Sequence, residues 1–263
     1  MARWIGLAPD PNSAQGGSTL DLLATPGPIT FPTPTVWVPA TTAQVDPGYQ
    51  NTDRNDEVRG VRGSAQPVPF TAAPSLTFTV RLYPEIAKLL IPAALGRVGS
   101  ATGTAPAPVT TPVRPVTGGK LPALAAWVLR EDQLDKLTGL WVEQLVLTVG
   151  EGDPTLEVTC QGLYHESGVT PGSGLPTPAY ADYDDPYASV TFKARTGAGS
   201  GTPIQCVANF SLTFSNNLDD DQDVRFCKGE NVLTQTVSGR YRRRQYPGRH
   251  SLGEQDITGT IGF

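Results

Sequence analysis

The chain has 263 residues, among them 28 glycines and 25 prolines, and only 17% of its residues are charged. This composition favours strands joined by loops over a helical bundle. The formal net charge of −5 argues against a protein that coats duplex DNA, because neutralising phosphates requires an excess of lysine and arginine.

Cysteine content and hydropathy exclude two further classes of protein. The three cysteines, Cys160, Cys206 and Cys227, contain no C-x-x-C pair, so the sequence predicts neither a disulfide framework nor a thiolate zinc site. No apolar run approaches the roughly 18–20 residues of a membrane span, and residues 1–23 do not resemble a secretion signal. We expect reduced thiols, no membrane span and a cytosolic site of synthesis and residence.

Prolines are dense in residues 1–74 and leave room only for short edge strands, such as residues 35–38. Apolar side chains such as Trp4 and Trp37 are unusual in a solvated linker, so this segment is expected to lie on its own core or on a neighbouring copy. We therefore predict an extended N-terminal arm, residues 1–74, followed by a β-sandwich domain, residues 75–263.

A strand and a helix are predicted at the start of this domain. Apolar and polar residues alternate through residues 75–82, as in a half-buried strand. Pro84 then suits the first position of a helix, and Gly96 suits its C-terminal cap. The apolar positions that share one face of this helix are Ile86, Leu89 and Leu90. We expect this face to cover an edge or an open face of the sheet.

Further strands follow along the chain. Residues 123–129 fit a strand or a helix, and we favour the strand. Residues 141–149 and 155–164 form the best hairpin candidate, because a Gly-Glu-Gly-Asp-Pro sequence joins them. Residues 97–122 and 165–188 show no periodicity and are interpreted as two long loops.

The segment ANFSLTFSNNLDDDQDV, residues 208–224, is the strongest strand signal, and the other strands are interpreted as its partners. Phe210, Leu212 and Phe214 alternate with polar residues and are expected to face the core. An Asn-Asn pair then ends the strand. The acidic residues that follow, which predict an exposed loop, are Asp219, Asp220, Asp221 and Asp223.

Signals for catalysis or metal binding are weak. Only His165 and His250 are available as bases near neutral pH, and both lie in turn-like sequence. The spacing from Asp219 to Glu230 matches a calcium-binding loop, but Val224 stands where that loop needs glycine. We favour a solvated acidic turn and predict neither an enzyme nor a bound cofactor.

The chain has one basic cluster, whose members are Arg240, Arg242, Arg243, Arg244 and Arg249. Three interpretations remain open for it. The arginines form a solvated hairpin end, they contact an acidic patch on another subunit, or they bind DNA together with interleaved tyrosines.

Several stretches stand out by their pattern and order: TFTVRLYPEIAKLLIPAALG, WVEQLVLTVGEGDPTLEVTCQGLY, and CVANFSLTFSNNLDDDQDV followed by KGENVLTQTVSGRY. Together they resemble the tail tube proteins, or major tail proteins, of long-tailed bacteriophages. Their order is a strand leading into a helix, a hairpin, an Asn-Asn strand end and a return strand. The resemblance covers residues 76–263, and it implies a β-sandwich or barrel-like tail tube fold with one flanking helix.

The resemblance also implies a function and partners. Copies of the chain would form rings of six, or alternatively three, whose inner strands join into a barrel, and the rings would stack into a tube. Implied partners are the tape measure, terminator and tail tip proteins, with transient, non-specific passage of DNA. The protein would belong to the virion and be assembled in the host cytoplasm.

The resemblance and the charge pattern together predict subunit contacts. A DNA conduit needs a neutral or acidic wall, because arginines on the wall would hold phosphates. We therefore expect Arg240, Arg242, Arg243 and Arg244 at subunit interfaces, with the acidic loop as their first candidate partner.

The alternative function is a carbohydrate-binding or receptor-binding β-sandwich of a tail tip, a baseplate or a cell surface. Tyr180, Tyr183 and Tyr187 would then contact the ligand.

Overall fold

The structure is a computed structural model, and it describes fourteen ranges of the chain. They are residues 3–10, 31–52, 68–99, 102–103, 113–115, 121–130, 133–150, 153–169, 191–192, 202–203, 209–218, 232–237, 240–245 and 255–262. In this part of the chain the fold is mainly β, with a closed six-stranded barrel, additional strands and a single helix, as predicted for the fold class.

The described helix is α1 (Pro84–Leu95). The strands are β1 (Arg3–Pro9), β2 (Val36–Asp46), β3 (Tyr49–Thr52), β4 (Val68–Ala72), β5 (Ser75–Arg81), β6 (Gly96–Val98), β7 (Val113–Pro115), β8 (Leu124–Arg130), β9 (Gln133–Val149), β10 (Thr155–Gln161), β11 (Tyr164–Val169), β12 (Thr191–Phe192), β13 (Thr202–Pro203), β14 (Asn209–Ser215), β15 (Val232–Val237), β16 (Arg240–Gln245) and β17 (Asp256–Gly262).

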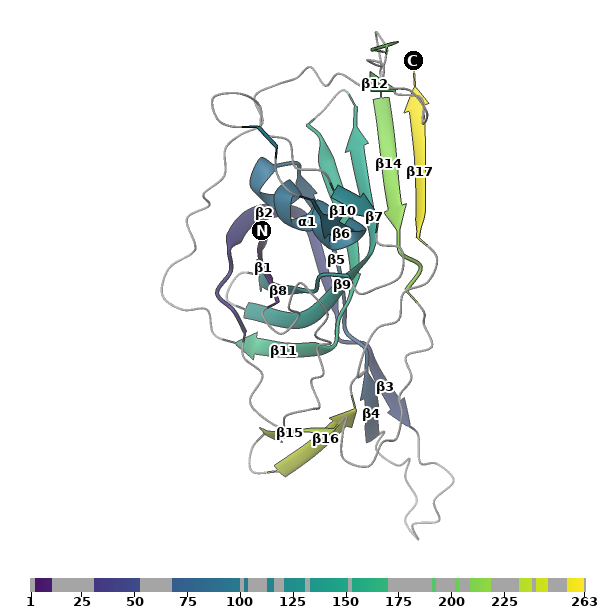
Figure 1. The fold of residues 1–263 in the computed structure, drawn as a ribbon. Coiled ribbons are helices and arrows are strands. Elements are labelled where there is room, and N and C mark those ends of the chain that lie inside the picture. Colours follow the sequence, from purple (N-terminus) through teal and green to yellow (C-terminus); the bar gives the residue numbers. More distant parts are fainter. Residues whose placement is uncertain are drawn as a thin grey trace.

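The barrel strands follow one another in the order β1, β2, β5, β10, β9, β8, and β8 returns to β1 (Figure 1). All of these pairings are antiparallel. Alternating apolar residues point into the barrel and form its core; those of β5, Leu76, Phe78 and Val80, have no exposed surface. The predicted alternation of residues 75–82 and the β9–β10 hairpin are both present.

β1 and β2 are barrel strands, and both lie in the segment, residues 1–74, that was predicted to form an extended N-terminal arm. β1 lies between β2 and β8, and Ile5 is completely buried. β2 has 11 residues and contacts both β1 and β5, so it is not a short edge strand. It accepts Pro39 because, among the described strands, only β1 pairs with that part of β2.

β9 is the strand around which the barrel closes, a position that the sequence analysis gave to residues 208–224. It has 17 residues, and the strands that pair with its first half differ from those that pair with its second half. Residues 133–140 pair with β8 and residues 144–149 with β14 on one edge, while β11 and β10 follow one another along the other edge. Gly139, with φ at +67°, lies at the start of this exchange.

α1 confirms the predicted helix and its ends. Pro84 occupies the first turn, and Gly96 caps the helix in the left-handed conformation with φ at 93°. Ile86 and Leu90 are completely buried in the barrel core, and Leu89 packs against the core with part of its surface exposed. No described helix is long and apolar enough to cross a membrane.

Smaller sheets lie outside the barrel. β15, β16, β4 and β3 form a four-stranded sheet in that order, while β6 pairs with β7 and β12 with β13. Figure 1 shows the four-stranded sheet below the barrel. The β14 and β17 pair lies at the upper right of the barrel in the same view.

Candidate assembly surface

Six strands form one continuous antiparallel layer in the order β2, β5, β10, β9, β14, β17. β2 enters this layer with its second half. Ala40 pairs with Arg3 of β1 and with Val80 of β5, so these two strands lie on opposite edges of β2. Beyond Ala40, the described pairing of β2 is with β5 alone.

One face of this layer carries hydroxyl and amide side chains, and we call it the hydroxyl-rich face. Its residues alternate along each strand with residues of the opposite, mainly apolar face and are paired with one another across the strands. They are Thr42, Gln44, Ser75, Thr77, Thr79, Thr155, Thr159, Gln144, Thr148, Ser211, Thr213, Ser215, Thr258 and Thr260, with Val146 as an apolar member. Thr42 Oγ1 donates to Thr79 Oγ1 at 3.0 Å across the β2–β5 pair.

Charged residues are few on the hydroxyl-rich face. Asp46, Glu157 and Asp256 continue the same alternation and are exposed. Arg81, at the end of β5, forms an exposed ion pair of 3.1 Å with Asp153. The described positions of the face therefore present a neutral to acidic surface.

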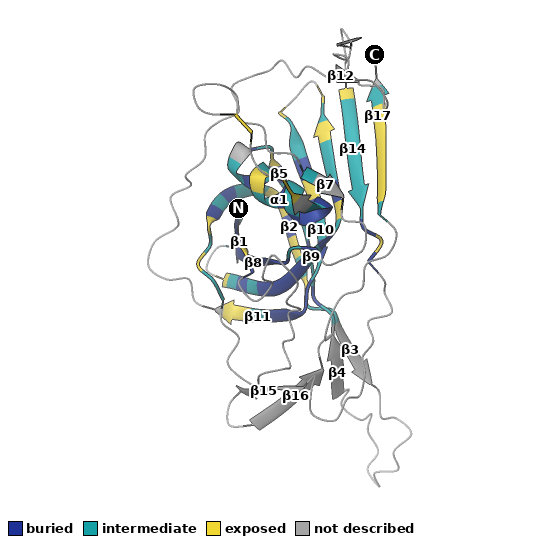
Figure 2. Ribbon diagram, viewed as in Figure 1, coloured by how far each residue is buried: buried dark blue, intermediate teal, exposed yellow. Residues whose placement is uncertain are grey.

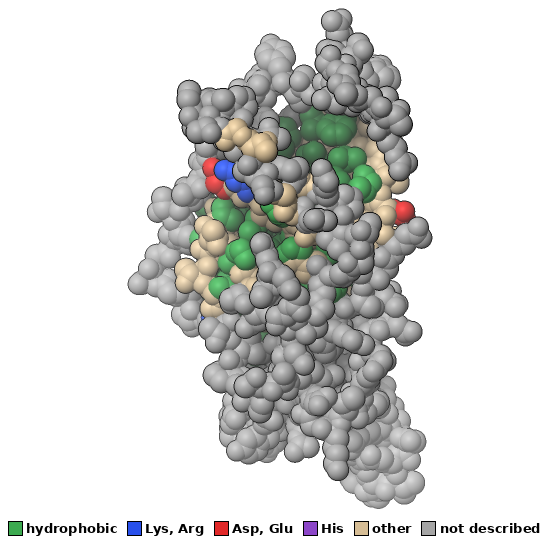
Figure 3. Space-filling model, viewed as in Figure 1, with side chains coloured by type: hydrophobic (Ala, Val, Ile, Leu, Met, Phe, Trp, Pro, Cys, Tyr) green, Lys and Arg blue, Asp and Glu red, His purple; other side chains and the backbone are tan. Residues whose placement is uncertain are grey.

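The opposite face of the layer is apolar and becomes more exposed with distance from the barrel. Leu145 of β9 is completely buried, every β14 residue from Phe210 to Ser215 is half-buried, and Ile257 of β17 is 47% exposed (Figure 2). Figure 3 shows hydrophobic side chains gathered beside α1, on the side where β14 lies.

The three residues predicted to form a core strand all fall on this apolar face. Phe214 packs against the barrel core, whereas Phe210 and Leu212 are not among the residues that contact it. The isolated chain thus leaves part of the predicted face accessible to solvent.

A buried corner holds the β14 and β17 pair against the barrel. Asn216 Nδ2 donates to the carbonyl oxygens of Ala94 at 3.0 Å and Val142 at 2.7 Å, which joins the end of α1 to β9. Gln255 Nε2 donates to Asn216 Oδ1 at 2.6 Å and so connects the start of β17 to the same corner. Asn217 follows with φ at 40°, a turn conformation that asparagine tolerates.

The edge of the layer at β17 is open. β14 is the described partner of β17, and residues 256–260 are all exposed. A second open edge lies along the second half of β2, in the segment that was interpreted as an arm.

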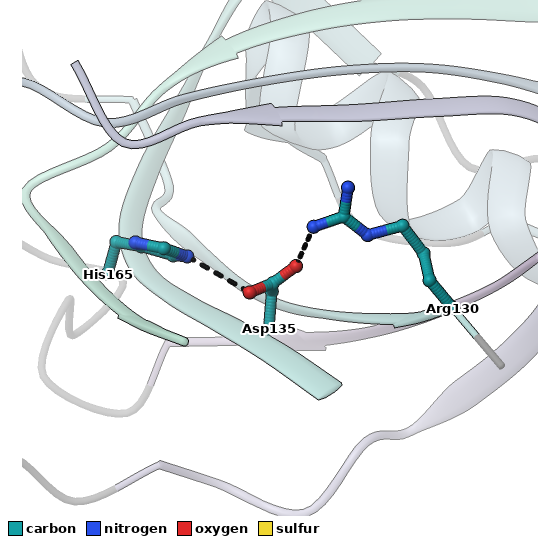
Figure 4. A network of polar contacts seen from close by, with 3 residues as sticks. All are labelled: Arg130, Asp135 and His165. Carbon is teal, nitrogen blue, oxygen red and sulfur yellow. Dashed lines mark hydrogen bonds and ion pairs between the residues drawn. The ribbon is translucent and has the colours of Figure 1, made fainter. Parts of the chain in front are cut away.

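A second polar group lies on the other side of the barrel, where β8, β9 and β11 meet (Figure 4). Asp135 is only 6% exposed; it accepts a hydrogen bond from Arg130 Nη2, and His165 Nε2 lies 3.3 Å from its Oδ1. Burial acts to raise the pKa of Asp135, but these contacts from His165 and Arg130 hold that pKa below its usual value. The buried Nδ1 of His165 has no hydrogen-bond partner among the described residues. The three side chains join β8, β9 and β11 to one another.

Of the two groups of residues predicted to meet at a subunit contact, the structure describes the arginines but not the aspartates. Arg240, Arg242, Arg243 and Arg244 fall in β16, paired with β15. Asp219, Asp220, Asp221 and Asp223 lie outside the described residues. Their meeting across an interface stays a prediction.

Cys160 is the cysteine that the structure describes. It is a buried free thiol, and burial raises its pKa. The tyrosines at positions 180, 183 and 187 lie outside the described residues.

The fold and surface define a structural protein built around exposed strand edges. Among the described residues, no group of three or more histidine, cysteine, aspartate or glutamate side chains is placed to hold a metal ion. The chain belongs to the phage tail tube protein family, whose model matches residues 15–263. It is thus a structural component of a phage tail. No curated protein matches the chain.

Proposed function

We propose that copies of this chain assemble head to tail into rings, and that the rings stack into the tube through which the phage genome passes. The hydroxyl-rich face lines the passage in this proposal. The observation that carries it is a six-stranded layer that is polar and nearly uncharged on one face, apolar on the other, and open at both edges.

The chemistry of this face suits sliding DNA. Each phosphate bound by lysine or arginine releases counterions and adds affinity, so a basic wall would retain the duplex. Threonine and serine hydroxyls exchange hydrogen bonds with water easily, and Asp46, Glu157 and Asp256 repel phosphates. A duplex therefore meets little that binds it.

Head-to-tail contacts follow from the two different edges of the layer. A contact between unlike surfaces generates a ring where the rotation closes. Six copies per ring is the expectation from the family and three is the alternative, with tape measure, terminator and tail tip proteins as further partners. Assembly takes place in the host cytoplasm before the tube joins the virion.

The first test is electron microscopy of the concentrated purified protein, in which we expect tubes with a central channel. The second test adds charge to the channel. The variant Thr77→Arg with Thr159→Arg places two cations at paired positions of the hydroxyl-rich face. The matched control, Gln133→Arg with Ser167→Arg, places two cations at exposed positions outside the hydroxyl-rich face, at the start of β9 and on β11.

Tubes assembled with short duplex DNA are then treated with nuclease. We expect protected DNA in the tubes of the Thr77→Arg and Thr159→Arg variant, retained at low salt and released steeply as salt rises. Unchanged tubes and the control variant should protect little. Equal protection by the control, or strong protection by the unchanged protein, would contradict a channel lined by the hydroxyl-rich face.

A further inference from the structure

We propose that a cavity beside α1 is filled by residues 20–23 of the same chain, the sequence Leu-Asp-Leu-Leu. The three leucines occupy the cavity, and Asp21 lies beside Lys88 at the cavity wall. Docking of this segment concerns the single subunit and does not depend on a tube. Three features of the chain support it: the lining of the cavity, the places where the chain enters and leaves the segment, and the charges.

The cavity has a volume of about 560 Å³ and lies between α1, the β6–β7 pair, the end of β1 and the start of β8 (Figure 1). A volume of this size is typical of pockets that hold an apolar ligand. The described lining is apolar apart from Lys88 and includes Pro9, Ala87, Ile91, Val98, Val113 and Leu124. Val98 is 44% exposed. Exposed apolar surface of this kind marks a place where another segment packs.

α1 is apolar on the side of the cavity as well as on the side of the barrel. Ile86 and Leu90 are completely buried in the core, whereas Ile91 is only partly buried and does not belong to that core. Glu85 and Lys88 are the charged side chains of the helix. A helix that is apolar around most of its circumference is expected to be covered on more than one side. The cavity side of α1 therefore suits an apolar occupant.

The chain passes into residues 11–30 at the rim of the cavity. Pro9 lines the cavity, and the N–H of Asp10 donates to the carbonyl oxygen of Ala123 at 3.0 Å. Leu20 follows Asp10 by ten residues, a length of chain that spans up to about 33–36 Å. Residues 20–23 therefore reach the cavity while Asp10 stays in place.

The return path of the chain is also short. Phe31 packs against Trp127 of β8, with 6.3 Å between the ring centroids. Leu124, three residues earlier in β8, lines the cavity. Three residues of a strand span only about 10 Å, so β8 holds both ends of residues 11–30 close to the cavity.

Charge favours residues 20–23 as the occupant. Residues 11–30 contain one charged residue, Asp21, and it is flanked by Leu20, Leu22 and Leu23. Lys88 is the charged residue of the described cavity lining and is exposed. Because the two charges have opposite signs, their attraction sets the orientation of the segment. An exposed ion pair adds little stability, so burial of the leucines contributes most of the binding.

Other candidate occupants fit the cavity less well. Residues 104–112 precede β7, contain no charged residue, and have Val109 as their largest apolar side chain. Residues 116–120 follow β7 and end in Lys120, whose charge has the same sign as that of Lys88. Residues 20–23 of another copy have the same sequence, but the segment of the chain itself is present at about millimolar local concentration because Asp10 holds it at the rim.

Cysteine cross-linking tests this contact in the full-length chain. Leu22→Cys places one thiol in the segment, and Val98→Cys places another at the cavity. The matched control joins Leu22→Cys to Ser167→Cys, at an exposed position of β11 that does not line the cavity.

All variants also carry Cys206→Ser and Cys227→Ser, while Cys160 stays because it is buried. Unlabelled and ¹⁵N-labelled chains are mixed, treated with a short bismaleimide before assembly and digested, and the linked peptides are identified by mass spectrometry. We expect a several-fold higher yield for the link between positions 22 and 98 than for the control, with both peptides of each pair carrying the same label. Pairs that join a labelled to an unlabelled peptide would place the segment on another copy and overturn the proposal.

A further variant separates docking from chance contact. Leu20→Ser with Leu23→Ser should lower the yield of the link several-fold, because two apolar side chains no longer enter the cavity. The same two substitutions should speed the maleimide labelling of a chain that carries Val98→Cys alone. A yield equal to that of the control, or a yield and labelling rate that the two serines leave unchanged, overturns the proposal. Tube formation plays no part in these measurements, so their failure leaves the proposed function untouched.

Discussion

At the scale of single residues, the lowered pKa of Asp135 predicts how the stability of the fold depends on pH at acidic pH. Its pKa in the folded chain is below its usual value of 3.8 because of His165 and Arg130, although burial opposes this shift. A carboxylate with a lowered pKa stabilises the fold above the pKa of the unfolded chain, and this contribution is lost as the pH falls through the folded value. The free energy of unfolding should therefore decline below about pH 4.

The variant Asp135→Asn tests this directly by urea unfolding at neutral and acidic pH. At neutral pH we expect a loss of about 1–3 kcal/mol, because the buried contacts with His165 are weakened while Arg130 retains access to water. The loss should shrink at acidic pH. The exposed Glu157→Gln serves as a control with little effect. An Asp135→Asn loss that does not change with pH would show that the pair does not set the acid dependence.

The same residues show why part of the polar structure escaped prediction. The sequence REDQLDK around Asp135 has the composition of a solvated turn, and His165 was assigned to a loop. The structure instead places Gln133 at the start of β9 and buries both side chains against β8 and β11. Partners 30 positions apart in the sequence satisfy each other, and a local pattern carries no information about them.

At the scale of elements, the sequence predicted those helices and strands whose pattern and ends are encoded by neighbouring residues. α1 was predicted from its proline start, apolar stripe and glycine cap, and the β9–β10 hairpin from alternation around a turn. β1 and the full length of β2 were missed because proline content was taken to exclude long strands, and only residues 35–38 were predicted as a short strand. A strand accepts proline where one edge is unpaired, and Pro39 lies in such a stretch.

Asn216 makes the attachment of β14 and β17 to the barrel testable. Asn216→Ala removes donors from the buried carbonyls of Ala94 and Val142 and the acceptor of Gln255. We expect a loss of about 2–4 kcal/mol, since each abandoned buried group costs about 1–3 kcal/mol and Gln255 still donates to Ala94. Hydrogen exchange should accelerate more in β14 and β17 than in β1 and β8.

The neighbouring Asn217→Gly is the matched control for this corner. Asn217 is exposed and has positive φ, which glycine adopts readily, so only a small change in stability is expected. Uniform acceleration of exchange across all strands in Asn216→Ala would contradict a role confined to this attachment.

At the scale of the whole molecule, one layer serves two purposes. Its apolar face contributes to the barrel core near β9 and becomes exposed toward β17, while its hydroxyl-rich face lines the proposed passage. A net charge of −5 opposes the association of free chains. From the sequence only the charge of a channel wall could be predicted, because the side-by-side order of the six strands depends on pairings between distant segments.

The arginines of β16 provide the last prediction, which also acts on the whole assembly. The described hydroxyl-rich face contains no residue of β16, which agrees with a position for these arginines away from the passage. We predict that some of them meet acidic side chains of neighbouring subunits, with Asp219, Asp220, Asp221 and Asp223 as the first candidates. Each exposed ion pair contributes only about 0–1 kcal/mol, but a ring and a stacked tube repeat the same pair many times.

Reversing Arg242 and Arg244 to glutamate should then block tube formation at low salt while the circular dichroism spectrum of the monomer is unchanged. Adding Asp219→Lys and Asp221→Lys should partly restore the tubes, because the reversed charges attract again. Lys88→Glu, at an exposed position of α1, is the control and should assemble normally. Normal tubes from the Arg242→Glu and Arg244→Glu variant would mean that these arginines are solvated, and the repeated ion pairs would then play no part in holding the tube together.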